Sequence, residues 1–207
     1  MIRIGIELNG VVRNINKQIL KYYQKDINPA LDLDDIDEND DVFKYAKFNS
    51  NAARNEFIYI DYPYEIFGCA KTLNKELPTD MNNWLSELTN YEEDDVEIFF
   101  FSMNEESLTI QSTYFFLSKI GTRVRKIIFP RSYDEILKEA DVVITADVDK
   151  LKNVDLYKIL IKNGFNGDGE EFANKSYNSL NEVIKDTELL TELHNFVKNK
   201  NDEQNKL

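Results

Sequence analysis

With 207 residues, the chain can form one domain of ordinary size or a core domain with a small insertion. Its residues are 42% apolar and 12% aromatic, which is enough for a real core and argues against a disordered chain. The 38 acidic residues outnumber the 25 Lys and Arg residues, giving a net charge of −13. We therefore expect neither a nucleic acid nor an anionic membrane as a direct partner.

Residues and patterns that the sequence contains only once, or lacks, argue against a disulfide, against histidine-based sites and against a membrane span. The single cysteine, Cys69, excludes an internal disulfide and suits a reducing compartment. The single histidine, His194, lies in a polar segment near the C-terminus, which argues against His-rich zinc sites and against Ser-His-Asp or Cys-His catalysis. No apolar run approaches about eighteen residues and no signal-peptide pattern is present, so no membrane span is expected and a cytoplasmic location is predicted.

The first predicted strand, residues 2–6, leads directly into polar side chains. It is followed by an acid, Glu7, an amide, Asn9, and a glycine at which the chain can turn, Gly10. Open α/β sheets bind their ligands at the carboxyl ends of strands, so this is a candidate site. An amphipathic pattern over residues 15–25 predicts a helix that packs back on the sheet and opens a βαβ unit.

Residues 28–90 have a different composition. The dense run of acids within 28–41 lacks the glycine and glutamate that an EF-hand needs, so we interpret it as a solvated loop, with a charged contact surface or loose cation site as the alternative. Residues 42–90 are predicted to form two or three helices. Their aromatic residues are interpreted as internal packing, with an exposed surface for a protein partner as the alternative. These residues are Phe43, Tyr45, Phe48, Phe57, Tyr59, Tyr62, Tyr64, Phe67 and Trp84.

The second half of the chain alternates strands and helices. A continuous apolar run predicts a buried strand ending at Ser102, and a helix over residues 107–120 is ended by Gly121. The apolar residues predicted to face inward on this helix are Leu108, Ile110, Tyr114, Phe115, Leu117 and Ile120. Further strands are predicted at 123–129, 141–147 and 156–162, with a short helix at 134–140, a loop at 164–169 and a final helix opened by a capping box at Ser179 and Glu182.

These features resemble the motifs of the haloacid dehalogenase-like (HAD) phosphohydrolase superfamily. The first strand resembles motif I, with Glu7 in the place of the nucleophilic aspartate and Asn9 in that of the general acid/base. Ser102 resembles the motif II residue that holds a phosphoryl oxygen. The strand at 141–147 resembles motif IV, whose two acids complete a magnesium site, but here the aligned residues are Thr145 and Ala146. The acids that follow that strand are Asp147 and Asp149, and the motif III lysine could be matched by Arg125, Lys126 or Lys138.

The resemblance implies an α/β fold, a three-layer Rossmann-like parallel sheet with a small helical cap. It implies a core domain at 1–27 and 96–197, a cap-like helical insertion with the acidic loop at 28–95, and a polar C-terminal tail at 198–207.

The two substitutions in motif I weaken the chemistry that the resemblance would otherwise imply. The longer Glu7 side chain displaces its carboxylate, and a shift of about 1 Å can cost roughly a hundredfold in rate. The amide of Asn9 has no proton to transfer, and losing a positioned acid/base costs roughly 10²–10⁴-fold. Magnesium would be left with Glu7 and Asp147 as weak candidate ligands.

The sequence therefore predicts a catalytically inactive, pseudoenzyme-like HAD-like domain, a structural or protein-binding component of a homo- or hetero-oligomeric assembly that needs no cofactor. A bacteriophage virion or tail protein is the specific hypothesis, because richness in Asn, Lys, Ile, Asp and Tyr is typical of AT-rich genomes, and the location would then be the virion. The alternative is a weakened Mg²⁺-dependent phosphatase or nucleotidase acting on a small phosphorylated metabolite. Glu7 would then be its nucleophile or metal ligand, and Ser102 would bind the phosphate.

Overall fold

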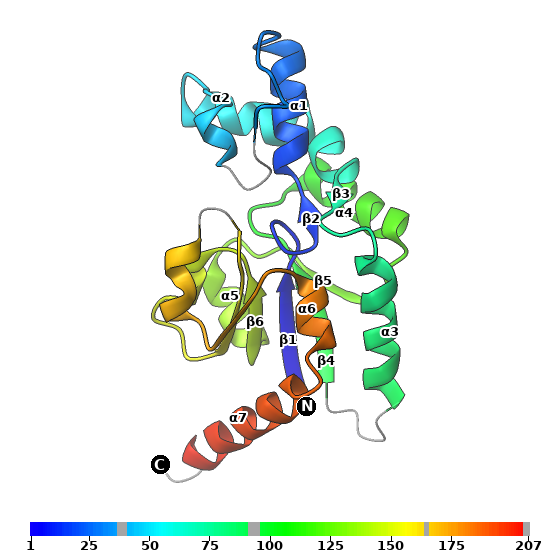
Figure 1. Cartoon of the computed structure of the whole chain (residues 1–207), viewed down its shortest axis with the longest axis vertical. Coiled ribbons are helices and arrows are strands. Elements are labelled where there is room, and N and C mark those ends of the chain that lie inside the picture. Colours follow the sequence, from blue (N-terminus) through cyan, green and yellow to red (C-terminus); the bar gives the residue numbers. More distant parts are fainter. Residues whose placement is uncertain (37–40, 91–95, 164–165, 205–207) are drawn as a thin grey trace.

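Six parallel strands form the central sheet of the computed structural model, which describes residues 1–36, 41–90, 96–163 and 166–204 (Figure 1). Their order across the sheet is β5 (Lys126–Ile128), β4 (Val96–Phe101), β1 (Ile2–Glu7), β6 (Val142–Thr145), β7 (Tyr157–Ile161) and β8 (Lys175–Tyr177). Because β1 lies between β4 and β6, Glu7 is placed beside the carboxyl ends of both neighbours. The edge strand β8 was not predicted, since its three residues carry no apolar run.

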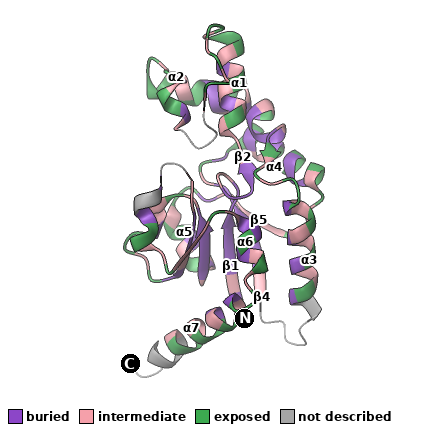
Figure 2. Cartoon of the chain, viewed as in Figure 1, coloured by how far each residue is buried: buried purple, intermediate pink, exposed green. Residues whose placement is uncertain are grey.

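The central strands are buried on both faces, as their continuous apolar runs predict (Figure 2). One face is covered by α3 (Leu77–Asn90), α4 (Ser107–Ile120), α6 (Leu180–Lys185) and α7 (Leu189–Gln204). The other is covered by α5 (Tyr133–Glu139) and the short helices η4 (Val148–Leu151) and η5 (Gly167–Phe172). This arrangement confirms the predicted three-layer α/β fold. None of the described helices is both long and apolar enough to cross a membrane.

A second, smaller cluster lies beyond the carboxyl ends of the strands (Figure 1). It is built from α1 (Asn16–Asp26), η1 (Val42–Lys44), α2 (Asn51–Glu56), η2 (Phe57–Asp61) and η3 (Tyr64–Gly68). Its core includes Ile19 and Tyr23 of α1 together with Phe57 and Phe67. The prediction that α1 packs back on the sheet was therefore wrong, because its apolar face is taken up by the aromatic residues of the following segment.

Packing assigns the segment at 28–95 to two places. Five of its aromatic residues, Phe48, Phe57, Tyr59, Tyr62 and Phe67, belong to the smaller cluster, but Leu77, Met81 and Trp84 of α3 pack on the sheet. A short antiparallel pair, β2 (Arg13–Asn14) with β3 (Lys71–Thr72), joins the two parts. The division into a core at 1–27 and 96–197, an insertion at 28–95 and a tail at 198–207 stays a prediction.

Helix α4 has the predicted bounds but a different buried face. It buries Thr109, Ser112, Thr113, Phe116 and Leu117. Three residues predicted to face inward are largely exposed: Leu108 (51%), Tyr114 (52%) and Phe115 (44%). The reason lies in the polar groups that the helix must cover, described below.

The predictions for two polar segments can be compared with the structure only over the residues that it describes. In the acidic segment, Asp32, Asp34 and Asp35 are exposed, as a solvated loop requires, while residues 37–40 lie outside the described residues. The predicted polar tail is helical as far as Gln204, because α7 continues through it, and residues 205–207 lie outside the described part.

Candidate functional site

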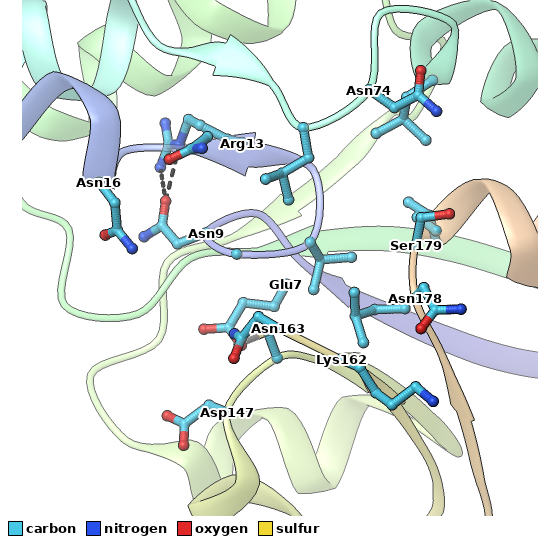
Figure 3. Close-up of a pocket in the computed structure, with 18 of the residues that line it drawn as sticks. Glu7, Asn9, Arg13, Asn16, Asn74, Asp147, Lys162, Asn163, Asn178 and Ser179 are labelled. Carbon is cyan, nitrogen blue, oxygen red and sulfur yellow. Dashed lines mark hydrogen bonds between the residues drawn. The ribbon is translucent and has the colours of Figure 1, made fainter. Parts of the chain in front are cut away.

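A pocket of about 530 Å³ opens at the carboxyl edge of the sheet, beside the β2–β3 pair (Figure 3). The residues that follow β1, β6, β7 and β8 all contribute to its lining, as expected for parallel strands whose carboxyl ends share one edge. The structure thus brings Glu7, Asn9 and Asp147 to one pocket. Ser102 lies behind this lining, fully buried and in contact with Asn9.

Both carboxylate oxygens of Glu7 are occupied by groups of the protein itself. The Thr145 hydroxyl donates to Oε2, and the Lys150 ammonium donates to Oε1. The Lys150 ammonium also lies 3.3 Å from the carboxylate of Asp147, the N-cap residue of η4. The two acids predicted as weak metal ligands therefore share a lysine.

Burial raises the pKa of Glu7, while the Lys150 ammonium and the Thr145 hydroxyl act in the opposite direction. On α5, the Tyr133 hydroxyl is buried without a hydrogen-bond partner. Its pKa is raised by burial first and then by the negative charges of Glu7 and Asp147. Lys150 is therefore the cation that offsets the negative charges of Glu7 and Asp147.

The donor set does not fit the magnesium ion that the resemblance of the sequence motifs implies. Magnesium requires oxygen ligands in near-octahedral geometry. Here the Thr145 hydroxyl donates a hydrogen bond to Glu7, Ala146 supplies no side-chain oxygen, and the Lys150 ammonium occupies the other carboxylate oxygen of Glu7. Within the described ranges, no three His, Cys, Asp or Glu side chains are placed to share a metal ion.

Asn9 is held by Arg13, which sequence reasoning did not select. The guanidinium donates to Asn9 Oδ1 from both Nε, at 2.9 Å, and Nη2, at 2.8 Å. The Asn9 amide nitrogen in turn donates to the Ser102 hydroxyl at 3.3 Å. Asn9 and Ser102 are thus hydrogen-bonded to each other directly, and the Arg13 guanidinium fixes the Asn9 amide.

Arg13 is fully buried and forms an ion pair with Glu105, whose side chain is equally buried. The Nη2–Oε1 distance is 2.7 Å, and Glu105 also accepts from the hydroxyls of Ser102 and Thr113. The guanidinium carbon lies 5.0 Å from the centre of the Phe67 ring and 5.4 Å from that of Phe116. Such stacking on aromatic faces adds to the stabilisation of a desolvated cation.

The other basic and acidic residues considered from the sequence lie away from Glu7. Lys126 pairs with Glu97 and Glu139, and Arg125 is exposed. The Lys138 carbonyl accepts from Arg3, and Asp149 pairs with Lys152 at the surface. The residues that sequence reasoning missed are Arg13, Glu105, Thr113 and Lys150. The available signals were a lone arginine after two valines and a lysine one helical turn beyond Asp147.

Comparison with solved structures defines the class of fold. A haloacid dehalogenase-like hydrolase from Burkholderia xenovorans LB400 aligns with a TM-score of 0.54 and 10% sequence identity, covering 91% of this chain and 98% of that chain. No protein-family model and no curated protein matches the sequence. The chain therefore has the HAD-like fold that its motifs predicted, and at this identity the likeness extends to the fold alone.

The Lys150→Met substitution should destabilise the protein in a pH-dependent way. It leaves Glu7 buried without its cation, so its pKa rises further and the native state binds a proton that the unfolded state releases above about pH 4.3. We expect a loss of about 3–5 kcal/mol at pH 8 and a smaller loss at pH 4, measured by urea unfolding. Lys152→Met, which removes an exposed pair, should cost less than about 1 kcal/mol. Equal losses at both pH values would contradict an ion pair at Glu7.

The Arg13–Glu105 pair should behave as a coupled unit. Arg13→Met leaves a buried carboxylate and should cost about 3–5 kcal/mol in urea unfolding. The double variant Arg13→Met/Glu105→Met should lose less than the sum of the two single variants, because no unpaired charge remains. Arg3→Met, at the partly exposed pair with Asp141, is the control for loss of an ordinary surface arginine. Simple additivity at Arg13 and Glu105 would refute the coupling.

Proposed function

We propose that this chain is a HAD-like domain that does not transfer phosphoryl groups and instead acts by binding, as a component of a protein assembly. The observation that supports the loss of phosphoryl transfer is the hydrogen bond that the Lys150 ammonium donates to Glu7. In-line attack requires a free carboxylate oxygen and a metal that neutralises the phosphate. In this chain Glu7 stands at the nucleophile's position, and the ammonium of Lys150 occupies one of its oxygens and supplies a positive charge there.

The other two catalytic positions support the same proposal. Asn9 cannot donate or take the proton of a leaving group, and its carbonyl oxygen accepts from Arg13. The Ser102 hydroxyl, which would hold a phosphoryl oxygen, donates to Glu105. Nucleophile, acid/base and phosphate-binding positions are thus each committed to internal partners.

The assembly part of the proposal is supported by exposed apolar side chains on α4, η2 and η3. Ile60, Tyr64, Leu108, Tyr114 and Phe115 are each 44–65% exposed, and the rings of Tyr64 and Phe115 lie 5.1 Å apart. Aromatic residues grouped at a surface are typical of protein interfaces. A place in a bacteriophage virion is a narrower form of this proposal and rests on the composition of the sequence.

Hydrolysis of 4-nitrophenyl phosphate tests the loss of catalysis. The native protein with Mg²⁺ should show no turnover above that of Glu7→Gln. Activity should appear, if anywhere, in the triple variant Glu7→Asp/Asn9→Asp/Lys150→Ala, ahead of the double variant Glu7→Asp/Asn9→Asp, because removing Lys150 opens the carboxylate. Mg²⁺-dependent turnover by the native protein that Glu7→Gln abolishes would instead establish a phosphatase or nucleotidase with a glutamate nucleophile.

Light scattering after size-exclusion chromatography tests the assembly. The native chain should form an oligomer, and Leu108→Ser/Phe115→Ser should reduce its mass towards that of one chain while leaving the circular dichroism spectrum unchanged. Glu7→Ala, a matched change inside the pocket, should leave the mass unaltered. A native protein that is monomeric at high concentration would rule out self-assembly through this surface.

A further inference from the structure

We propose that the pocket at the carboxyl edge of the sheet binds a small neutral polyhydroxylated compound, a free sugar or polyol. This goes beyond the proposed loss of catalysis, and it is carried by the chemistry of the lining and by one unsatisfied buried acceptor. The pocket's volume of about 530 Å³ lies within the roughly 300–1,000 Å³ typical of small-molecule sites.

The lining is unusually rich in amides. Seven asparagines contribute: three from the loops that follow strands of the main sheet, three from around the β2–β3 pair and the start of α1, and one from α6. Figure 3 shows Asn16 and Asn74 on one side of the pocket and Asn163 and Asn178 on the other. An amide presents a donor and an acceptor side by side, which matches a hydroxyl group, itself both donor and acceptor.

Asn181 supplies the observation that points to a ligand. It lines the pocket, is only 5% exposed, and its Oδ1 is buried without a hydrogen-bond partner. Its Nδ2 donates to the Asp80 carboxylate, so the amide cannot be turned around without placing two oxygens together. A buried acceptor of this kind costs about 1–3 kcal/mol unless a donor reaches it. A hydroxyl group of a bound compound would provide the donor after a small shift of the Asn181 side chain, because its oxygen has almost no accessible surface in the structure.

The charges of the lining disfavour an anionic ligand. Lys150 is paired with Glu7 and Asp147, and Arg13 with Glu105. Lys162, the remaining cation among the described lining residues, lies 3.3 Å from Glu170 at the surface. A phosphate would have to displace one of these carboxylates, whereas a neutral compound leaves every pair intact.

The apolar part of the lining separates sugars from nucleosides. Aliphatic side chains, including Ile15, Leu73 and Ile161, can cover the C–H face of a sugar ring. Over the described residues, the lining contains no aromatic side chain on which a base could stack. Stacking on aromatic rings is how proteins commonly hold bases, so the lining favours a polyol over a nucleoside.

Titration calorimetry with D-glucose, D-ribose and D-mannitol, alongside glucose 6-phosphate and adenosine, tests the proposal. At least one of the three neutral compounds should bind with a Kd below about 1 mM, and the phosphate ester should bind more weakly than glucose. Asn181→Leu should weaken binding by about tenfold, the loss expected for one buried hydrogen bond, while the same change at the exposed Asn55 of α2 should not.

If Asn181→Leu does not fold, Leu73→Arg replaces it, because Leu73 is half exposed at the pocket and the longer side chain would occupy it. Three results would overturn the proposal: no binding of the neutral compounds, tighter binding of glucose 6-phosphate or adenosine, or unchanged affinity in a folded pocket variant. These results are independent of the phosphatase assay, so failure of one proposal can be told from failure of the other.

Discussion

The buried guanidinium of Arg13 constrains the whole carboxyl edge of the sheet. A fully desolvated cation must be paired and hydrogen-bonded, and Arg13 satisfies this requirement with Glu105, Asn9 and Thr113. Glu105 precedes α4 and Thr113 lies within it, so the polar face of that helix turns inward. The same rotation turns Tyr114 and Phe115 outward, which leaves them exposed on the surface that we propose contacts a protein partner.

Lys150 imposes the second constraint, at the opposite side of the site. A carboxylate at the end of a central strand is expensive to bury alone, and a neighbouring ammonium reduces that cost. By lying between Glu7 and Asp147, Lys150 joins the loop after β6 to β1 in the way that a bridging metal could. Lys150 therefore places one positive charge between two carboxylates, where a divalent ion would place two.

The fold was largely predictable because its main signals are local. Continuous apolar strands, the helix ended by Gly121 and the polar ends of β1 and β4 each follow from short stretches of sequence. The orientation of α4 was not predictable. Apolar spacing indicated one buried face, whereas the hydrogen bond from the distant Arg13 to Thr113 requires another. For the same reason α1 was misplaced: its apolar stripe is real, but the sheet and the aromatic cluster are equally suitable partners for it.

The candidate site was predictable only where it follows the strand ends. Glu7, Asn9 and Ser102 lie at the end of a strand or within two residues of it, and their positions together with the motif resemblance identify them. Arg13, Glu105 and Lys150 act through contacts across the fold, and the sequence separations of 92 and 143 residues leave no local pattern. Their significance lies in what they leave for a ligand. Once both internal cations have internal partners, the polar groups that remain in the pocket are mainly amides, so the proposed selection of a neutral compound depends on hydrogen-bond geometry with little contribution from charge.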